Sequence, residues 1–229
     1  SGGVAIGGAT GISYTPPAYT TAGDNYYYAT VTLTGSGCNM ISSTTATVTV
    51  VNDPVIDTQP ISTQTICQST TPTNLSVTAS GGVPSASFTY QWYKNSTNSN
   101  ASGTMILGAN APTYMPPNTT VGTMYYFCIA TQSPPSSGCS VISNTAEVII
   151  KKAPSFTAQP ASSDLCKDGA PNQLSVTYTD GVGAPSYQWY SNTTNSTTGG
   201  TSISTATGSA FTPPTSAVGT TYYYCVVDL

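Results

Sequence analysis

Six cysteines are the most chemically versatile residues of this chain: Cys38, Cys67, Cys128, Cys139, Cys166 and Cys225. A thiolate can act as a nucleophile, ligate a soft metal or form a disulfide. The chain contains no histidine, which excludes a Cys-His or Ser-His-Asp system and a histidine-containing zinc site. Cysteines without such partners favour disulfides and therefore an oxidising location outside the cytosol.

Carboxylates are the second group that could do chemistry. The eight acidic residues are Asp24, Asp53, Asp57, Glu147, Asp164, Asp168, Asp180 and Asp228. None keeps its position between the repeats described below, and nothing places two of them the few ångströms apart that glycosidase chemistry needs. Calcium held by Asp53, Asp57 and backbone carbonyls at a linker is an alternative with few ligands. We predict no catalytic residue, no metal site and no cofactor.

Aromatic rings and sequons are the third group. Aromatic runs at 26–28, 125–127 and 222–224 could stack on sugars, but alternation along a strand sends at least half of the rings into a core. Six N-x-S/T sequons begin at Asn74, Asn95, Asn100, Asn118, Asn192 and Asn195. They indicate glycosylation only weakly, because a chain so rich in Asn, Ser and Thr produces them by chance.

The composition predicts a folded all-β protein. Charged residues make up 5% of the chain and the net charge is -4, which excludes a basic surface for nucleic acid. No stretch approaches the ~20 apolar residues of a membrane span, so no direct membrane insertion is expected. The 16 tyrosines, together with many Val, Ile and Thr, favour strands over disorder or helices.

The elements that must position these residues repeat along the chain. TYQWYKNSTNSN at 89–100 returns as SYQWYSNTTNST at 186–197, and Y-T-P-P at 14–17 marks a further copy of Y-M-P-P at 114–117. A period near 100 residues predicts tandem domains: the second half of a repeat at 1–51, a complete repeat at 52–151, and a repeat without its last strand at 152–229. We expect the natural chain to be longer at both ends.

The complete repeat reads as about seven short strands separated by Gly- and Pro-rich turns. Leu75, Val77 and Ala79 alternate with polar residues, as in a half-buried strand, and 123–131 forms a hairpin with 142–150. This pattern predicts immunoglobulin-like β-sandwich repeats. The predicted core residues are Trp92, Tyr126, Trp189 and Tyr223.

The cysteine pairing follows from comparing repeats. The first repeat keeps Cys38, the equivalent of Cys139, but has Ala29 where Cys128 stands, so a Cys128–Cys139 bridge would leave Cys38 without a partner. We predict a Cys67–Cys139 disulfide that closes a loop of about 72 residues and stabilises the repeat by roughly 4 kcal/mol. Cys128 and Cys225 would be unpaired thiols, and Cys38 and Cys166 would pair outside this chain. A Cys128–Cys139 bridge is the alternative.

A recurring string of motifs resembles a known family. The string contains T-Q-P at 58–60, T-I-C-Q at 65–68, Y-Q-W-Y, N-S-T, Y-x-P-P, V-G-T-x-Y-Y and S-G-C-S at 137–140. It is similar to the immunoglobulin-like repeats of giant cell-surface adhesins of Bacteroidetes, including gliding-motility adhesins of flavobacteria. The resemblance implies a non-enzymatic stalk, export by type IX secretion, and an extracellular location attached to the outer membrane. It also implies three partners: neighbouring repeats, surface polysaccharide, and outer-membrane motility or secretion machinery bound through other regions.

Two other functions fit the sequence. A carbohydrate-binding or spacer module of a secreted polysaccharide-degrading enzyme would show exposed, coplanar aromatic rings on one face. A subunit of a surface filament would complete its open sheet edges with strands from neighbouring chains.

Overall fold

The structure is a computed structural model that describes residues 2–33, 35, 40–84, 86–133 and 139–229. Every regular element in these residues is a β-strand, which confirms the all-β prediction. None of them forms a helix long and apolar enough to cross a membrane.

Contacts divide the chain into two compact units. The first contains Ser1–Asp57, Ala79–Thr89 and Ala130–Val141, and the second contains Thr58–Thr78, Tyr90–Ile129 and Ile142–Leu229. The repeat borders at 52 and 152 stay predictions from the sequence.

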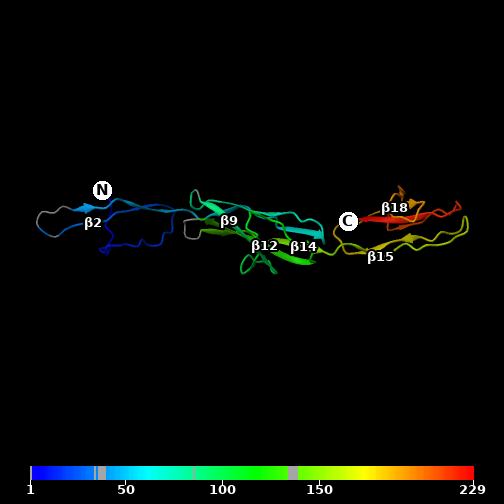
Figure 1. Ribbon diagram of the computed structural model, residues 1–229, viewed down its shortest axis with the longest axis horizontal. Helices are drawn as coiled ribbons and strands as arrows, with labels where there is room; N and C mark the ends of the chain where they lie inside the picture. Colours follow the sequence, from blue (N-terminus) through cyan, green and yellow to red (C-terminus); the bar gives the residue numbers. More distant parts are fainter. Residues whose placement is uncertain (1, 34, 36–39, 85, 134–138) are drawn as a thin grey trace. The chain divides into compact units, whose positions relative to one another are not determined.

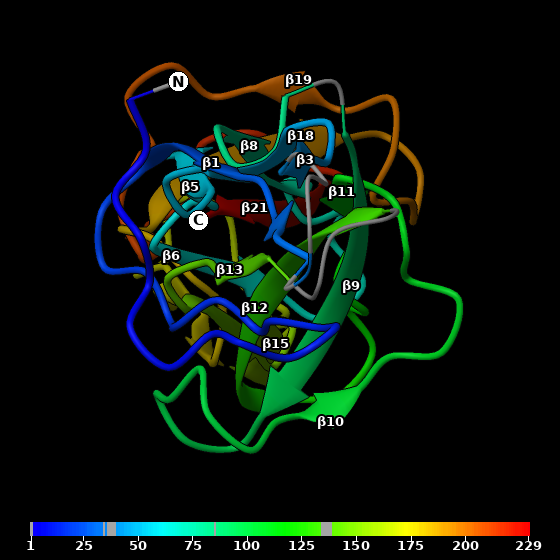
Figure 2. The ribbon, with the colours of Figure 1, turned by 90° about the vertical axis from the view of Figure 1, so that its left-hand side faces the viewer.

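The larger sheet of the middle repeat is built on two long strands, β9 and β12 (Figure 1). Its strands are β6 (Thr63–Cys67), β9 (Ser87–Asn95), β10 (Thr104–Met105), β12 (Gly122–Ser133), β13 (Ser140–Ile142) and β14 (Ala146–Lys151). The order is β10, β9, β12, β14, β6, and β13 also pairs with β12. β14 runs antiparallel to β12 and parallel to β6. Figure 2 shows the twist of β9 and β12 that long strands of L-residues adopt.

Two short strand pairs form the opposite layer. β5 (Val55–Thr58) pairs with β8 (Thr78–Ser80), and β7 (Leu75–Ser76) pairs with β11 (Thr113–Tyr114). Only Val77 separates β7 from β8, and its N–H donates to the carbonyl of Pro112 at 3.0 Å. Leu75 and Val77 are buried whereas Ser76 and Thr78 are exposed, so the predicted alternation is confirmed.

The core of the middle repeat lies between these layers. It contains Leu75, Val77, Trp92, Tyr126, Cys128, Ala146, Val148 and Ile150. Three of these residues come from β14, whose small and β-branched side chains alternate with Glu147, Ile149 and Lys151. β14 therefore closes the core on one side.

The third repeat has the same pairings over fewer strands. Its elements are β15 (Ser155–Ala158), β16 (Leu174–Ser175), β17 (Thr177–Thr179), β18 (Ser186–Asn192), β19 (Thr201–Ser202), β20 (Ala210–Phe211) and β21 (Tyr222–Asp228). One sheet has the order β19, β18, β21, and the pairs β15 with β17 and β16 with β20 correspond to the second layer. Its smaller core contains Leu174, Val176, Trp189 and Ala206.

The first repeat is a hairpin with no buried side chain among its described residues. β1 (Gly23–Tyr27) pairs with β4 (Ala46–Val50), and β2 (Thr30–Val31) pairs with β3 (Ile41–Ser42). This hairpin corresponds to β12, β13 and β14 of the middle repeat, as the sequence offsets predict.

The architecture is that of tandem immunoglobulin-like β-sandwiches. Two layers enclose a tryptophan on a central strand, and a tyrosine stands two residues before a cysteine on the next long strand. The N-terminal segment of the middle repeat contributes to both layers. β5 pairs with β8 in one layer, and β6 pairs with β14 in the other.

Candidate functional site

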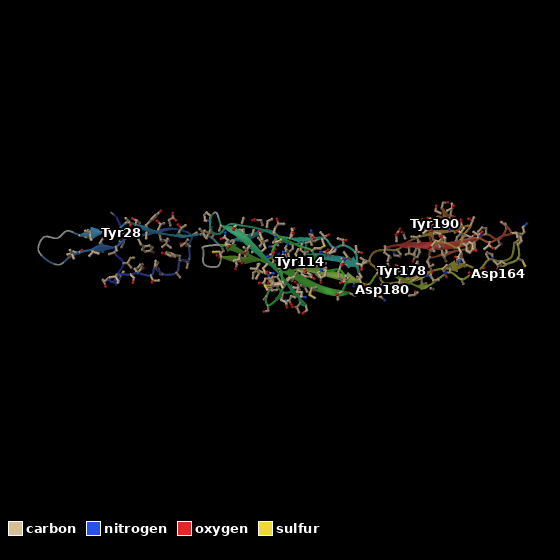
Figure 3. All side chains as sticks on the ribbon, in the orientation of Figure 1. Tyr28, Tyr114, Asp164, Tyr178, Asp180 and Tyr190 are labelled. Atoms are coloured by element: carbon tan, nitrogen blue, oxygen red, sulfur yellow. The ribbon has the colours of Figure 1, made fainter. Side chains whose placement is uncertain are left out.

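The middle repeat is centred on Trp92, which has no exposed surface. Its ring lies 5.9 Å from that of Tyr114, between centroids, and the Tyr114 ring lies 5.6 Å from that of Tyr126. Tyr114 is labelled in Figure 3. The indole N–H donates to the carbonyl of Ala111 at 3.0 Å, so the polar atom of the tryptophan is satisfied inside the core. These contacts are structural, and they leave no face of Trp92 for a ligand.

The third repeat builds the same cluster from different residues. Trp189 is also fully buried and lies 5.9 Å from Phe211, which lies 5.5 Å from Tyr223. Its indole N–H donates to the carbonyl of Gly208 at 3.0 Å. Tyr223 is half-buried, whereas its counterpart Tyr126 is 3% exposed.

A glutamine precedes each tryptophan in the sequence. Its side chain forms hydrogen bonds that join the tryptophan's strand, β9 or β18, to the turn that follows the adjacent strand, β10 or β19. Gln91 donates through Nε2 to the carbonyls of Trp92 at 2.9 Å and Ile106 at 2.8 Å. Gln188 donates at the same distances to the carbonyls of Trp189 and Ile203. Sequence reasoning missed this role, although the glutamine recurs in both Q-W motifs.

A buried serine was also missed. Ser143 has no exposed surface, and its Oγ accepts from the N–H of Cys128 at 2.9 Å and donates to the carbonyl of Asn144 at 2.9 Å. In the first repeat, Ser43 makes the equivalent bonds with Ala29 and Thr44. In the middle repeat, the Ser143 hydroxyl therefore joins the segment that leads into β14 to strand β12.

Replacing Ser143 by alanine should lower the free energy of unfolding of the middle repeat by about 1–3 kcal/mol, because the Cys128 N–H would lose its acceptor inside the protein. Denaturant unfolding followed by Trp92 fluorescence, in a Trp189→Phe background, measures the effect. Ser140→Ala, at an exposed position, is the control and should change the free energy by less than about 0.5 kcal/mol. Equal effects of the two variants would contradict the assignment.

Most sequon asparagines are turn residues in this fold. Asn95 donates through Nδ2 to the carbonyls of Ser99 and Ala101, and its Oδ1 accepts from Thr97. Asn192 repeats this turn, and Asn100 and Asn118 also donate to backbone carbonyls. These four amides shape loops, which accounts for their presence without glycosylation.

The outer aromatic rings pair with one another. Tyr93 and Phe127 stack at 5.2 Å and 8°, and Tyr190 and Tyr224 stack at 5.0 Å and 6°. A Cβ placed on Gly103 would lie 2.5 Å from the Phe127 ring, so loop backbone covers that pair closely. Phe127 is only 2% exposed. The stacked faces are therefore occupied by neighbouring rings rather than open to a sugar.

The carboxylates serve local contacts. Asp57 accepts from the hydroxyl of Ser80 at 2.7 Å. Glu147 accepts from the hydroxyl of Tyr125 at 2.9 Å, and this bond raises the pKa of that tyrosine. Across residues 2–33, 35, 40–84, 86–133 and 139–229, no three His, Cys, Asp or Glu side chains gather into a group that could hold a metal ion.

The strand register corrects the predicted Cys67–Cys139 disulfide. Both thiols are free. Cys67 lies opposite Lys151, at the end of the sheet where β12 begins with Gly122, whereas the carbonyl of Cys139 accepts from the N–H of Gln132 near the end of β12. Ten residues of strand span about 33 Å, far beyond the ~7 Å between Cα atoms that a disulfide allows.

The remaining cysteines differ in exposure. Cys128 is fully buried and Cys225 is half-buried, and both thiols are unpaired, as is that of the exposed Cys166. The alternative Cys128–Cys139 bridge is likewise not formed. Cys38 lies outside the described residues.

Burial raises the pKa of the Cys128 thiol to about 11, from 9.0 in an exposed thiol. The folded repeat therefore keeps the thiol neutral while the unfolded chain ionises it, and stability is complete below pH 9 and is lost as the pH rises toward 11. We expect the free energy of unfolding of the middle repeat to fall by about 2–3 kcal/mol over this range.

Equilibrium unfolding at a series of pH values tests the expectation. Cys128→Ala, which introduces the residue found at the equivalent Ala29 of the first repeat, should remove most of the decline between pH 9 and 10. The raised pKa of Tyr126, about 12, adds a loss above pH 10 that this variant retains. An unchanged decline in the variant would assign the pH dependence to other groups.

An open groove of about 660 Å³ lies along one edge of the third repeat. Its lining includes Leu165, Leu174, Pro213, Val218 and Tyr223. β21 pairs with β18 on its other side, and no strand of the described residues pairs with β21 along the groove. The groove is therefore lined by both polar and apolar side chains of the third repeat.

The profile of a family described as a domain of unknown function, DUF8696, matches residues 58–152 and 157–229. The chain belongs to this family. The two DUF8696 matches cover most of the middle and third repeats. No curated protein matches the chain.

Solved structures similar to this DUF8696 chain are arrays of immunoglobulin-like or fibronectin-like domains. Titin domains I67–I69 are 19% identical, with 74% of this chain and 55% of the titin fragment covered and a TM-score of 0.40. Extracellular domains 3–5 of Drosophila OTK are 18% identical, with 80% and 54% covered and a TM-score of 0.40. The fibronectin(III)-like modules of Clostridium thermocellum CbhA are 14% identical, with 76% and 84% covered and a TM-score of 0.32. The chain thus spans about half the length of the first two.

Proposed function

We propose that this chain is a stalk segment of a secreted, surface-attached repeat adhesin. In this role its repeats carry tension and hold a distant binding region away from the cell, and they perform no reaction. We further propose that the adhesin is attached to the bacterial outer membrane and that it serves gliding on surfaces.

The parallel pairing of β6 with β14 carries the proposal. Five residue pairs, from Thr63 with Glu147 to Cys67 with Lys151, join the first edge of the middle repeat to its last strand. Two further backbone bonds extend the ladder: the N–H of Glu147 to the carbonyl of Ser62 at 2.8 Å, and the N–H of Gln68 to the carbonyl of Lys151 at 2.7 Å. The start of β6 and the end of β14 lie at opposite ends of a parallel ladder. Tension along the chain therefore loads these bonds together, in shear.

What recurs between repeats also supports a scaffold. The tryptophan with its backbone acceptor, the glutamine beside it and the asparagine turn appear in both the middle and third repeats. All of these groups are directed at the protein's own backbone. The recurring chemistry maintains the fold rather than contacting a substrate.

Attachment to polysaccharide would then come from many weak contacts rather than one site. The chain is rich in Ser, Thr and Asn, and Tyr26, Tyr28 and Tyr222 are 64%, 42% and 36% exposed, so single rings are open to weak sugar contacts. A carbohydrate-binding or spacer module of a secreted polysaccharide-degrading enzyme stays the alternative, and it would need exposed coplanar rings on one face. The other proposed partners are neighbouring repeats and, through other regions, outer-membrane secretion and motility machinery.

Retention on polysaccharide-coated beads tests the adhesive part of the proposal. We expect the single chain to bind with a Kd weaker than about 1 mM, and particles displaying many copies to be retained at least ~100-fold better because of avidity. Bovine serum albumin on the same particles is the control. Micromolar binding by the single chain would instead support a dedicated carbohydrate-binding module.

A further inference from the structure

We propose that an apolar hollow on the middle repeat is a contact site for a second copy of this chain, with the two copies related by a twofold axis. The hollow is formed by residues between Ile106 and Met115, from the turn after β10 to the residue after β11. Both layers of this repeat and its last strand are present, so the hollow is a feature of the folded repeat. A lateral contact of this kind is independent of the stalk proposal, which concerns tension along one chain.

The hollow has room for one aliphatic side chain. Its volume is about 270 Å³, which exceeds the ~150 Å³ of an apolar cavity that binds benzene. Its lining includes Ile106, Leu107, Ala109, Ala111 and Met115, and none of its nine lining residues is charged. An apolar group is therefore the chemical match for this site.

The core beneath the hollow fixes its shape. The backbone N–H of Trp92 donates to the carbonyl of Ala109 at 2.9 Å, and the indole N–H donates to that of Ala111 at 3.0 Å. The N–H of Ile106 donates to the carbonyl of Trp92 at 3.0 Å. Because the site is already ordered by the buried tryptophan, little conformational entropy is lost when a partner binds.

Leu107 supplies the group that fits the hollow. Its side chain is 90% exposed, and that of Met115, which also lines the hollow, is 56% exposed. A leucine that projects beside an apolar hollow on one copy can enter the same hollow on a second copy. A twofold axis makes both insertions at once, since each copy presents the same surface to the other. With no charged residue in the lining, this contact brings no like charges together.

The third repeat shows that the fold does not require these apolar groups. In the aligned sequence, Ser204 stands in the place of Leu107 and Thr212 in the place of Met115. Ala206, the counterpart of Ala109, is 5% exposed, whereas Ala109 is half-buried. The exposed leucine and the open floor beside it are therefore specific to the middle repeat, as expected of a contact site.

The size of the hollow predicts a weak dimer. Nine residues line it, whereas a standard interface has about 20–30 residues on each side. We therefore expect a reversible dimer with a Kd on the order of 0.1 mM, in the range of transient complexes. A twofold contact is closed, so this site forms dimers and no larger species.

Sedimentation of the whole chain with its thiols kept reduced tests the association. We expect a monomer at about 10 µM and mostly dimer near ~1 mM. Leu107→Ser, which introduces the residue of the third repeat, should raise the Kd at least about tenfold, because two leucine side chains are no longer buried. Val121→Ser, at a 50% exposed valine outside the hollow, is the control and should leave the Kd unchanged. An unchanged dimer in Leu107→Ser, or a monomer at every concentration, would overturn the proposal.

A pair of charge variants tests the twofold geometry. Leu107→Asp and Ala111→Lys should each be monomeric alone, because each would bury a charge without a partner. An equimolar mixture should restore the dimer: the intact Leu107 of one chain enters the intact hollow of the other, and the two introduced charges meet at the second contact. Val121→Lys in place of Ala111→Lys should leave the Leu107→Asp chain monomeric. Circular dichroism checks that the variants fold, and a mixture of folded variants that stays monomeric would contradict the contact between positions 107 and 111.

Discussion

Replacing Trp92 by alanine is expected to lower the free energy of unfolding of the middle repeat by about 3–5 kcal/mol, the largest effect we predict for a single side chain. The ring is fully buried, lies against Tyr114 and donates its N–H to the carbonyl of Ala111. Alanine would leave a cavity and an unsatisfied carbonyl. The loss is a large fraction of the ~5–15 kcal/mol that stabilises a typical domain.

Hydrogen exchange of the β9 and β12 amides measures this loss, and Trp189 fluorescence follows the third repeat as an internal reference. Trp92→Phe keeps a large ring but loses the N–H, so it should recover most of the stability. A loss below about 1 kcal/mol in Trp92→Ala would show that the tryptophan is not the centre of the core.

Replacing Ile149 by proline should abolish the mechanical resistance of the middle repeat. Ile149 lies in β14 between Thr123 of β12 and Thr65 of β6, with its side chain on the face away from Val148 and Ile150. Proline removes an N–H from a strand that is paired on both sides, a position at which proline is not tolerated. We expect a loss of at least about 1–3 kcal/mol in stability and no resolved rupture of this repeat under load.

Ile149→Thr is the matched control, because it shortens the side chain at the same site and keeps the N–H. It should keep the rupture event with a change in stability below about 1 kcal/mol. If the threonine variant loses the event as the proline variant does, the side chain rather than the backbone ladder carries the load.

Sequence periodicity predicted the strands and cores well, because those depend on neighbouring residues. Alternation at Leu75, Val77 and Ala79 and the Q-W motif located the inner faces of both layers. Counting offsets between copies also identified the hairpin of the first repeat. Each of these inferences uses only which residues face inward along a strand.

Comparing repeats along the sequence could not predict how strands far apart in the chain are aligned within the sheet. Equivalent cysteines in different repeats show which positions correspond, but not that Cys67 and Cys139 belong to opposite ends of one sheet. The roles of Gln91 and Ser143 were missed for a related reason, since their backbone partners are set by the tertiary fold. The sequon asparagines have two explanations, glycosylation and turn formation, and the hydrogen bonds of Asn95, Asn100, Asn118 and Asn192 show that four of the six support turns or loops.

Stretching the unaltered chain in a single-molecule force experiment tests whether the repeats are a load-bearing scaffold. We expect the middle repeat to resist tension until the β6–β14 ladder fails in one step. Releasing the residues from Thr63 to Lys151 should then lengthen the chain by roughly 300 Å. A gradual extension without a rupture, or a step of clearly different length, would show that the ladder does not carry the load.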